Sequence, residues 1–349
     1  VQFGTPQTMD GGVTVQQLLF DGSYIVGLEA SNVYLDISKN ILEKTALEIK
    51  KSIISTYSSI LLIQENIHFL EKNRDNLTNN LNEVRELFRN GFEEEESVEQ
   101  LRLTLSGIET QLRYAQSTEK ITLNMLKLLM GFPTDAPLEL LDNLDTLTTE
   151  GLFDQEFESD LSIANNIDIK IAATNLRSES LLYKYEKSKN LPRLAAFING
   201  NYTGNSQSFS FISSDQKWFG AALLGINLQV PVFSSFKRRA QSQKAKIAVA
   251  QAETTLEETQ ERISIEVQAA INDYELAIET YFTNKENLAL ANRIEQKNQS
   301  KYFEGMASTF ELRQAQLQLY SAQNSYISAI QNVIQKKLNL ETLLNTTDQ

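Results

Sequence analysis

The chain has 349 residues, a formal net charge of −13, no cysteine and one histidine. The negative charge argues against nucleic acid as a partner, because duplex binding needs a basic face. The missing cysteines exclude thiol catalysis and Cys-based zinc sites, and His68 alone supports no triad or His-based metal site. We therefore expect no enzyme activity, no cofactor and no metal, and His68 is interpreted as an ordinary helix-surface or groove residue.

Proline and glycine positions divide the chain into elements. Neither residue occurs from 28 to 90, from 232 to 304, or after 305. A helix of ~60 residues would be ~90 Å long, which one globular core cannot bury, so coiled coils or helical barrels are indicated. In chain order we expect strand 13–20, helix 22–88, helix 93–130, helix 162–189, strand 194–203, strand 218–230, helix 234–302 and helix 308–343.

The strands alternate in polarity. In 218–230 the apolar positions are Ala222, Leu224, Ile226, Leu228 and Val230, and the positions between them include Gly225, Asn227 and Gln229. Such a strand can face lipid on one side and water on the other. No apolar run is long enough for a membrane helix, so any membrane crossing would use strands of a closed barrel. Trp218, Tyr202 and Phe219 fit an aromatic girdle or core packing equally, and Gly11, Gly12 and Gly204 are interpreted as loop residues.

Heptad seams mark the long helices. Apolar residues recur at alternating steps of three and four, the spacing of coiled-coil packing. One seam contains Ile263, Val267, Ala270, Tyr274, Ala277 and Tyr281, and another contains Leu312, Ala315, Leu319, Ala322, Tyr326, Ala329 and Val333.

The sequence is internally duplicated. Segment 13–20 matches 226–233, and Phe88–Gly91 matches Tyr302–Gly305 at an offset of 214 residues. We expect a first repeat over 1–131, a connecting equatorial segment over 132–161, a second repeat over 162–343 and a tail over 344–349. The first repeat should also contain counterparts of the helix at 161–189 and of the strand from Leu194, and both would precede Val1. The chain also opens at Val1 without Met, which suggests a processed or truncated piece.

These features resemble the TolC family of outer-membrane efflux proteins. The supporting segments are 16–22, 230–235, the Leu191–Pro192 step and the paired turns at Gly91 and Gly305. The resemblance implies a mainly α fold with a small β part, in which long antiparallel helical hairpins form the α-barrel of a trimer and strands contribute to a transmembrane β-barrel. It also implies a homotrimer in outer-membrane lipid of a Gram-negative bacterium, extending into the periplasm. The partners would be a periplasmic adaptor (membrane fusion) protein and, indirectly, an inner-membrane transporter.

The family pattern also suggests site residues. The turns would contact the adaptor through Phe88, Gly91, Tyr302 and Gly305. Glu311 matches an acidic constriction position, about 9 Å beyond Gly305 at 1.5 Å per residue, and Gln314 and Ser97 are the other constriction candidates. The second constriction acid is replaced by Gln314 and an expected arginine by Ala307, which puts the usual salt-bridge latch in doubt.

Two readings stay open for the acidic residues Glu93, Glu94, Glu95 and Glu96. They are either a solvated helix start, favoured by the helix dipole, or an acidic ring at a pore entrance that attracts cations. Two functions from different classes also remain. The chain is either an exit duct of a tripartite drug efflux or type I secretion system, or a soluble coiled-coil scaffold or adaptor without a pore.

Overall fold

A computed structural model describes residues 4–142, 144 and 163–345, which form two compact units. Of the described residues, the first unit contains 4–40 and 168–259, and the second contains 41–142, 144, 163–167 and 260–345. Part of the expected connecting segment and the end of the expected tail lie outside the described residues. The elements are β1 (Gln7–Asp21), α1 (Gly22–Arg89), α2 (Glu95–Leu129), a short 3₁₀ turn (Ile163–Asn165), α4 (Ile167–Ser188), β2 (Arg193–Ser206), β3 (Trp218–Gln229), α5 (Lys237–Phe303) and α6 (Thr309–Leu344).

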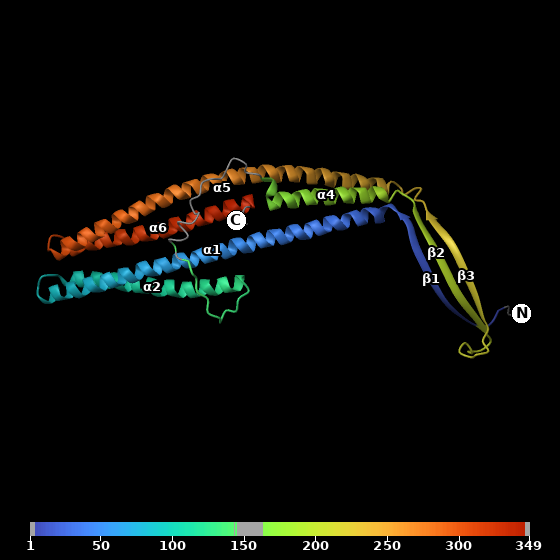
Figure 1. Cartoon of the computed structure of the whole chain (residues 1–349), viewed down its shortest axis with the longest axis horizontal. Helices are drawn as coiled ribbons and strands as arrows, with labels where there is room; N and C mark the ends of the chain where they lie inside the picture. Colours follow the sequence, from blue (N-terminus) through green and yellow to red (C-terminus); the bar gives the residue numbers. More distant parts are fainter. Residues whose placement is uncertain (1–3, 143, 145–162, 346–349) are drawn as a thin grey trace. The chain divides into compact units, whose positions relative to one another are not determined.

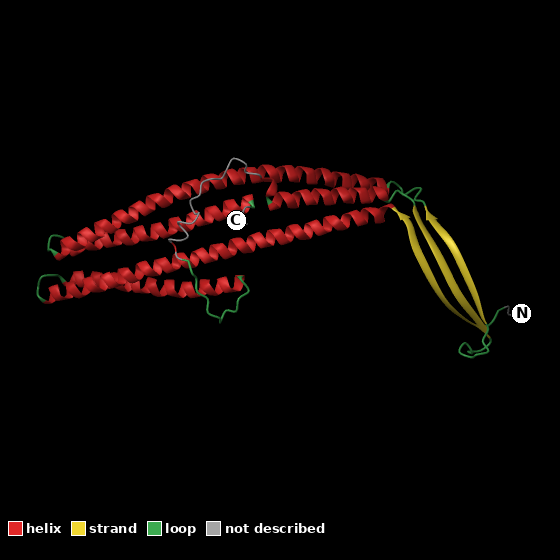
Figure 2. Ribbon diagram, viewed as in Figure 1, coloured by secondary structure: helices red, strands yellow, loops and turns green. Residues whose placement is uncertain are grey.

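The first unit contains an antiparallel sheet in the order β1-β2-β3 (Figure 2). The register places Val15, Ile198 and Leu224 side by side, and in the next cross-strand row Asn199 lies between Thr14 and Leu223. Antiparallel partners share a face, so one face of the sheet is largely apolar. The other face carries polar pairs, in which Asn199 Nδ2 donates to Thr14 Oγ1 at 2.7 Å and Thr203 Oγ1 donates to Asp10 Oδ1 at 2.6 Å. The alternation predicted for 218–230 is confirmed.

Two strands are longer than predicted. β1 starts at Gln7 rather than at residue 13, and β2 continues to Ser206, so Gly11, Gly12 and Gly204 lie in strands. The interpretation of these glycines as loop residues was wrong. Glycine weakens an isolated strand, but here the ladder continues through it, with Gly11 opposite Tyr202 and Gly204 opposite Met9.

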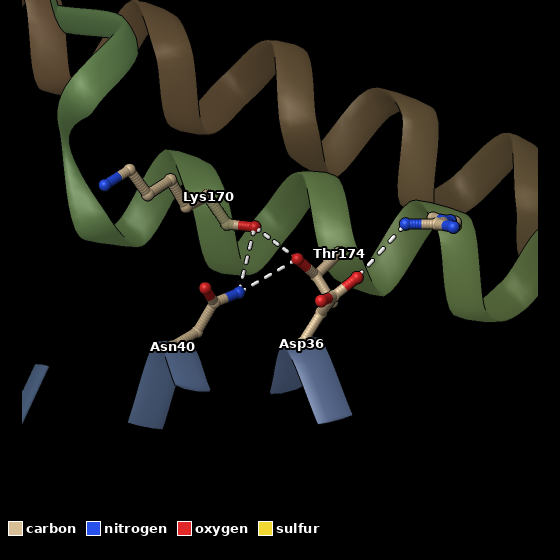
Figure 3. A network of polar contacts seen from close by, with 5 residues as sticks. Asp36, Asn40, Lys170 and Thr174 are labelled. Carbon is tan, nitrogen blue, oxygen red and sulfur yellow. Dashed lines mark hydrogen bonds and ion pairs between the residues drawn. The ribbon is translucent and has the colours of Figure 1, made fainter. Parts of the chain in front are cut away.

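Polar contacts join the start of α1 to α4 in the same unit (Figure 3). Asn40 Nδ2 donates to Thr174 Oγ1 at 2.9 Å, and Thr174 Oγ1 donates to the Lys170 carbonyl at 2.8 Å. One turn away, Arg177 forms an ion pair with Asp36 at 3.1 Å. These side chains hold α1 and the N-terminal half of α4 side by side.

The second unit is built from two helical hairpins, α1 with α2 and α5 with α6 (Figure 1). Every residue of the predicted 263–281 seam is buried, and the 312–333 seam is buried except for the half-buried Ala322 and Tyr326. The Tyr281 and Tyr326 rings meet across the second hairpin with their centroids 5.8 Å apart. The heptad prediction is therefore confirmed.

The two hairpins have nearly equal dimensions. α1 and α5 have 68 and 67 residues, and α2 and α6 have 35 and 36. This agrees with the duplication seen in the sequence and with its offset of 214. Within the described part of the chain, no helix has both the length and the apolar character needed to span a membrane.

Candidate functional site at the two hairpin turns

The two turns that end α1 and α5 have the same backbone geometry. Gly91 and Gly305 adopt left-handed conformations, with φ of 80° and 71°. Phe92 N donates to Leu87 O at 2.9 Å, and Met306 N donates to Lys301 O at 2.8 Å. This is the Schellman arrangement, which satisfies the last carbonyls of a helix and favours glycine. Each helix therefore ends at the same place in its repeat.

The following helices begin differently. Ser308 Oγ accepts a hydrogen bond from Glu311 N at 3.2 Å, and Glu311 Oε2 accepts one from Ser308 N at 2.8 Å, which completes a capping box. These two groups of Ser308 lower the pKa of Glu311. At the matching position of α2, Glu94 makes no side-chain cap. The spacing Ser-x-x-Glu is a capping signature that the sequence analysis did not use.

Glu311 lies in the first turn of α6, and not two turns into a helix. The estimate of 9 Å assumed a helix directly after Gly305, but α6 begins only at Thr309. Glu311 is therefore in the first turn of α6, exposed, with its carboxylate engaged by Ser308. Ser97, at the equivalent position of α2, is half-buried, and Gln314 is exposed beside a groove between α5 and α6.

Glu93 links the two turns. Its Oε1 accepts a hydrogen bond from Thr309 Oγ1 at 2.6 Å and a longer one from Tyr302 Oη at 3.4 Å. Glu93 is half-buried, while Glu94, Glu95 and Glu96 are exposed at the start of α2. The structure thus separates one member of the acidic run from the other three. Sequence reasoning had grouped all four, because nothing local to the run distinguishes Glu93.

The residues named as adaptor contacts are exposed to different extents. Tyr302 is only 7% exposed, and its burial raises the pKa of its hydroxyl, as do the nearby Glu93 and Glu83 carboxylates. Phe88 is partly exposed, at 40%. The most exposed apolar side chains around the turns are ones the sequence analysis did not select, namely Phe92, Met306 and Phe310.

Beneath the turns lies an apolar core shared by both hairpins. It packs residues of α1 and α2 against Tyr302 of α5 and Leu312 of α6. Ala307, which stands where the family pattern has an arginine, packs against this core. The arrangement can hold the two turns together without that arginine, through packing and through the Glu93 hydrogen bonds.

Long helical hairpins joined to a one-sided antiparallel sheet define the architecture of outer-membrane efflux channels. The chain matches the family model "Outer membrane efflux protein" over residues 159–346, more than half of its length. It belongs to this family. The resemblance to TolC-family proteins found in the sequence is thereby confirmed.

Solved structures share the fold at low sequence identity. The outer membrane protein VceC from Vibrio cholerae is 14% identical, with a TM-score of 0.76 over 97% of this chain and 87% of VceC. CusC is 16% identical with a TM-score of 0.78 over 97% and 83% of the two chains. The Campylobacter jejuni outer membrane channel CmeC is 15% identical with a TM-score of 0.75 over 97% and 77%. No curated protein sequence matches the chain significantly.

Proposed function

We propose that this protein is the outer-membrane exit duct of a tripartite drug efflux or type I secretion system, in which three copies form one channel and no reaction is catalysed. The observation that carries this proposal is the sheet. Its apolar face leaves Val15, Leu224 and Ile226 between 62% and 74% exposed, which is costly in water and favourable against lipid.

The sheet also needs neighbours. Among the described residues, β1 and β3 each have one edge with no strand beside it, and open edges are not tolerated in a bilayer. Pairing these edges with strands of other copies closes the sheet into a barrel with the polar face inside. A soluble scaffold, the alternative function, gives no reason for the exposed apolar face.

The turns fit a docking role at the periplasmic entrance. Phe92 and Met306 are 79% and 66% exposed, and exposed apolar side chains on a turn suit the tip of a partner's helical hairpin. Phe88, Gly91, Tyr302 and Gly305 shape and support this surface. The adaptor is therefore expected to lose affinity when Phe92 and Met306 are both changed to Ser, while Leu103→Ser, at an exposed apolar position within α2 and away from the turns, leaves binding unchanged.

Glu93 is proposed to keep the entrance closed, with Glu311 on the wall of the constriction beside Gln314 and Ser97. The test is conductance of the purified protein in planar bilayers. Glu93→Gln should raise the open probability several-fold, because a charge-assisted acceptor becomes a neutral one. Glu311→Ala should reduce cation preference.

Glu95→Gln is the matched control, since this carboxylate is exposed and bonded to neither turn. The channel proposal fails if the wild-type protein gives no conductance or leaves the membrane fraction without detergent. The gate assignment fails separately if Glu93→Gln and Glu95→Gln behave alike.

A further inference from the structure

Buried amide side chains lie where α1 of the first hairpin meets α6 of the second. The interface between the hairpins therefore combines the shared apolar core described above with buried polar side chains. Asn73 Nδ2 donates to Gln323 Oε1 at 2.7 Å, and both side chains are buried. We call the following four buried residues the amide seam: Asn73 and Asn80 on α1, and Gln316 and Gln323 on α6.

The heptad spacing aligns the second pair with the first. Asn80 is seven residues after Asn73, and Gln316 is seven residues before Gln323, so each lies on the same helix face about 10.5 Å along. α1 ends at its turn and α6 begins at its turn, so Asn80 and Gln316 both lie nearer to the turns than Asn73 and Gln323 do. Glu93 joins the two turns, which places the second pair of amides at a common level. Asn80 and Gln316 are each 1% exposed, and none of their four amide atoms forms a hydrogen bond of good geometry with any described residue.

A buried carboxylate adjoins this seam. Glu295 of α5 is 5% exposed and lies near enough to the Gln316 amide for that amide to lower its pKa, although no hydrogen bond of good geometry joins the two side chains. The charged or titratable groups that influence it are Lys72 of α1 and Tyr320 of α6, and no ion pair within 4 Å reaches it from the described residues. A buried carboxylate without a close cation favours its neutral form. Burial accordingly raises the pKa of Glu295, and Lys72 and Gln316 offset part of that shift.

We propose that Glu295 and the amide seam form a proton-operated joint between the two hairpins. When Glu295 is protonated, the interface stays closed and the hairpins keep one register. When Glu295 loses its proton, the buried charge draws water into the seam, where the Asn80 and Gln316 amides gain the hydrogen-bond partners that they lack in the closed interface. The joint depends on the pairing of the hairpins and not on the proposed transport function.

The sign of the pH effect follows from linkage. A carboxyl whose pKa is raised by folding binds its proton more tightly in the folded state. The contribution of Glu295 to the free energy of unfolding therefore falls as the pH rises from 4.5, the ordinary pKa of a glutamate, through the raised pKa. Above the raised pKa this contribution is constant. Glu83 and Glu341 also have raised pKa values. Since they stay in every variant, their contribution cancels when variants are compared.

The first measurement is thermal unfolding of the full-length protein between pH 4.5 and 8. The wild type should lose about 2–4 °C of melting temperature relative to Glu295→Gln as the pH rises. The control is Glu286→Gln, an exposed carboxylate on the same helix, which should follow the wild type. Equal pH dependence of wild type and Glu295→Gln would overturn the proposal.

The second measurement separates a joint from a merely buried carboxylate. The chain has no cysteine, so spin labels can be placed on Asn82→Cys in α1 and Gln318→Cys in α6, both exposed. Labelled chains are diluted with unlabelled ones. At pH 5 we expect a single narrow distribution of distances between the two spin labels, and at pH 8 a broader distribution with a longer mean distance. In the Glu295→Gln variant the distribution should stay narrow at both pH values.

If the distribution is the same at both pH values in the wild type, the proposal is wrong, whether or not the variant folds. A melting shift without a change in distance would also contradict it, because Glu295 would then act on stability without moving the hairpins.

Discussion

Single residues distinguish two turns that share one backbone path. Ser308 and Glu94 occupy equivalent positions, 214 residues apart, yet only Ser308 caps its helix with a side chain. Glu93 and Ala307 are likewise equivalent, and the first forms hydrogen bonds across the turns while the second packs on the core. The duplication thus supplies matched internal controls for each role.

Ser308→Ala should speed hydrogen exchange of the first-turn amides of α6 about fivefold, since losing an N-cap costs about 1 kcal/mol. Glu94→Ala should leave the first turn of α2 unchanged, because Glu94 makes no cap. The pKa of Glu311 is lowered by its bonds to Ser308, so the cap is complete above pH 4.5 and weakens as the pH falls through the lowered pKa. If the first-turn amides of α6 exchange at the same rate in Ser308→Ala as in the wild type, this account is wrong.

At the scale of the elements, the helices end where backbone conformation demands it. Gly305 has φ of 71° with no atom within 4 Å of an added Cβ, so a side chain there meets only conformational strain. Gly107 lies inside α2, also with open space around it. One glycine ends a helix, and the other is tolerated within one.

Gly305→Ala should therefore destabilise the protein by roughly 1–2 kcal/mol, the cost of a left-handed conformation. Gly107→Ala should stabilise it by about 0.5–1 kcal/mol, because alanine loses less entropy in a helix. Chemical unfolding of both variants checks the pair. Opposite signs are expected, and the same sign in both would show that the turn does not constrain residue 305.

At the scale of the whole molecule, self-association is expected. Besides the apolar face of the sheet, α1 exposes Tyr34, Ile41 and Leu42 at 58–73%, which one copy leaves uncovered. Light scattering of the detergent-solubilised protein should give a protein mass near three times 39.5 kDa. A stable species of one chain mass would count against the trimer.

Much of this architecture could be predicted from the sequence, because helix length, heptad burial and the turn glycines are local signals. The start of β1 could not, since Gly11 and Gly12 belong to a strand only through their pairing with β2. The role of Glu93 could not be predicted from the sequence either, because it depends on how one hairpin packs against the other. Glu311 was chosen through family resemblance, while its bond to Ser308 was readable from the spacing alone.

α1 and α5 have nearly equal lengths, 68 and 67 residues, so the two turns can meet. Glu93 reaches Thr309 at 2.6 Å only because both helices deliver their turns to the same level. One extra heptad in α1 alone would move its turn by about 10 Å, far beyond a hydrogen bond, and leave the other turn behind. A change in length survives in this protein only when it is made twice, in whole heptads, once in each repeat.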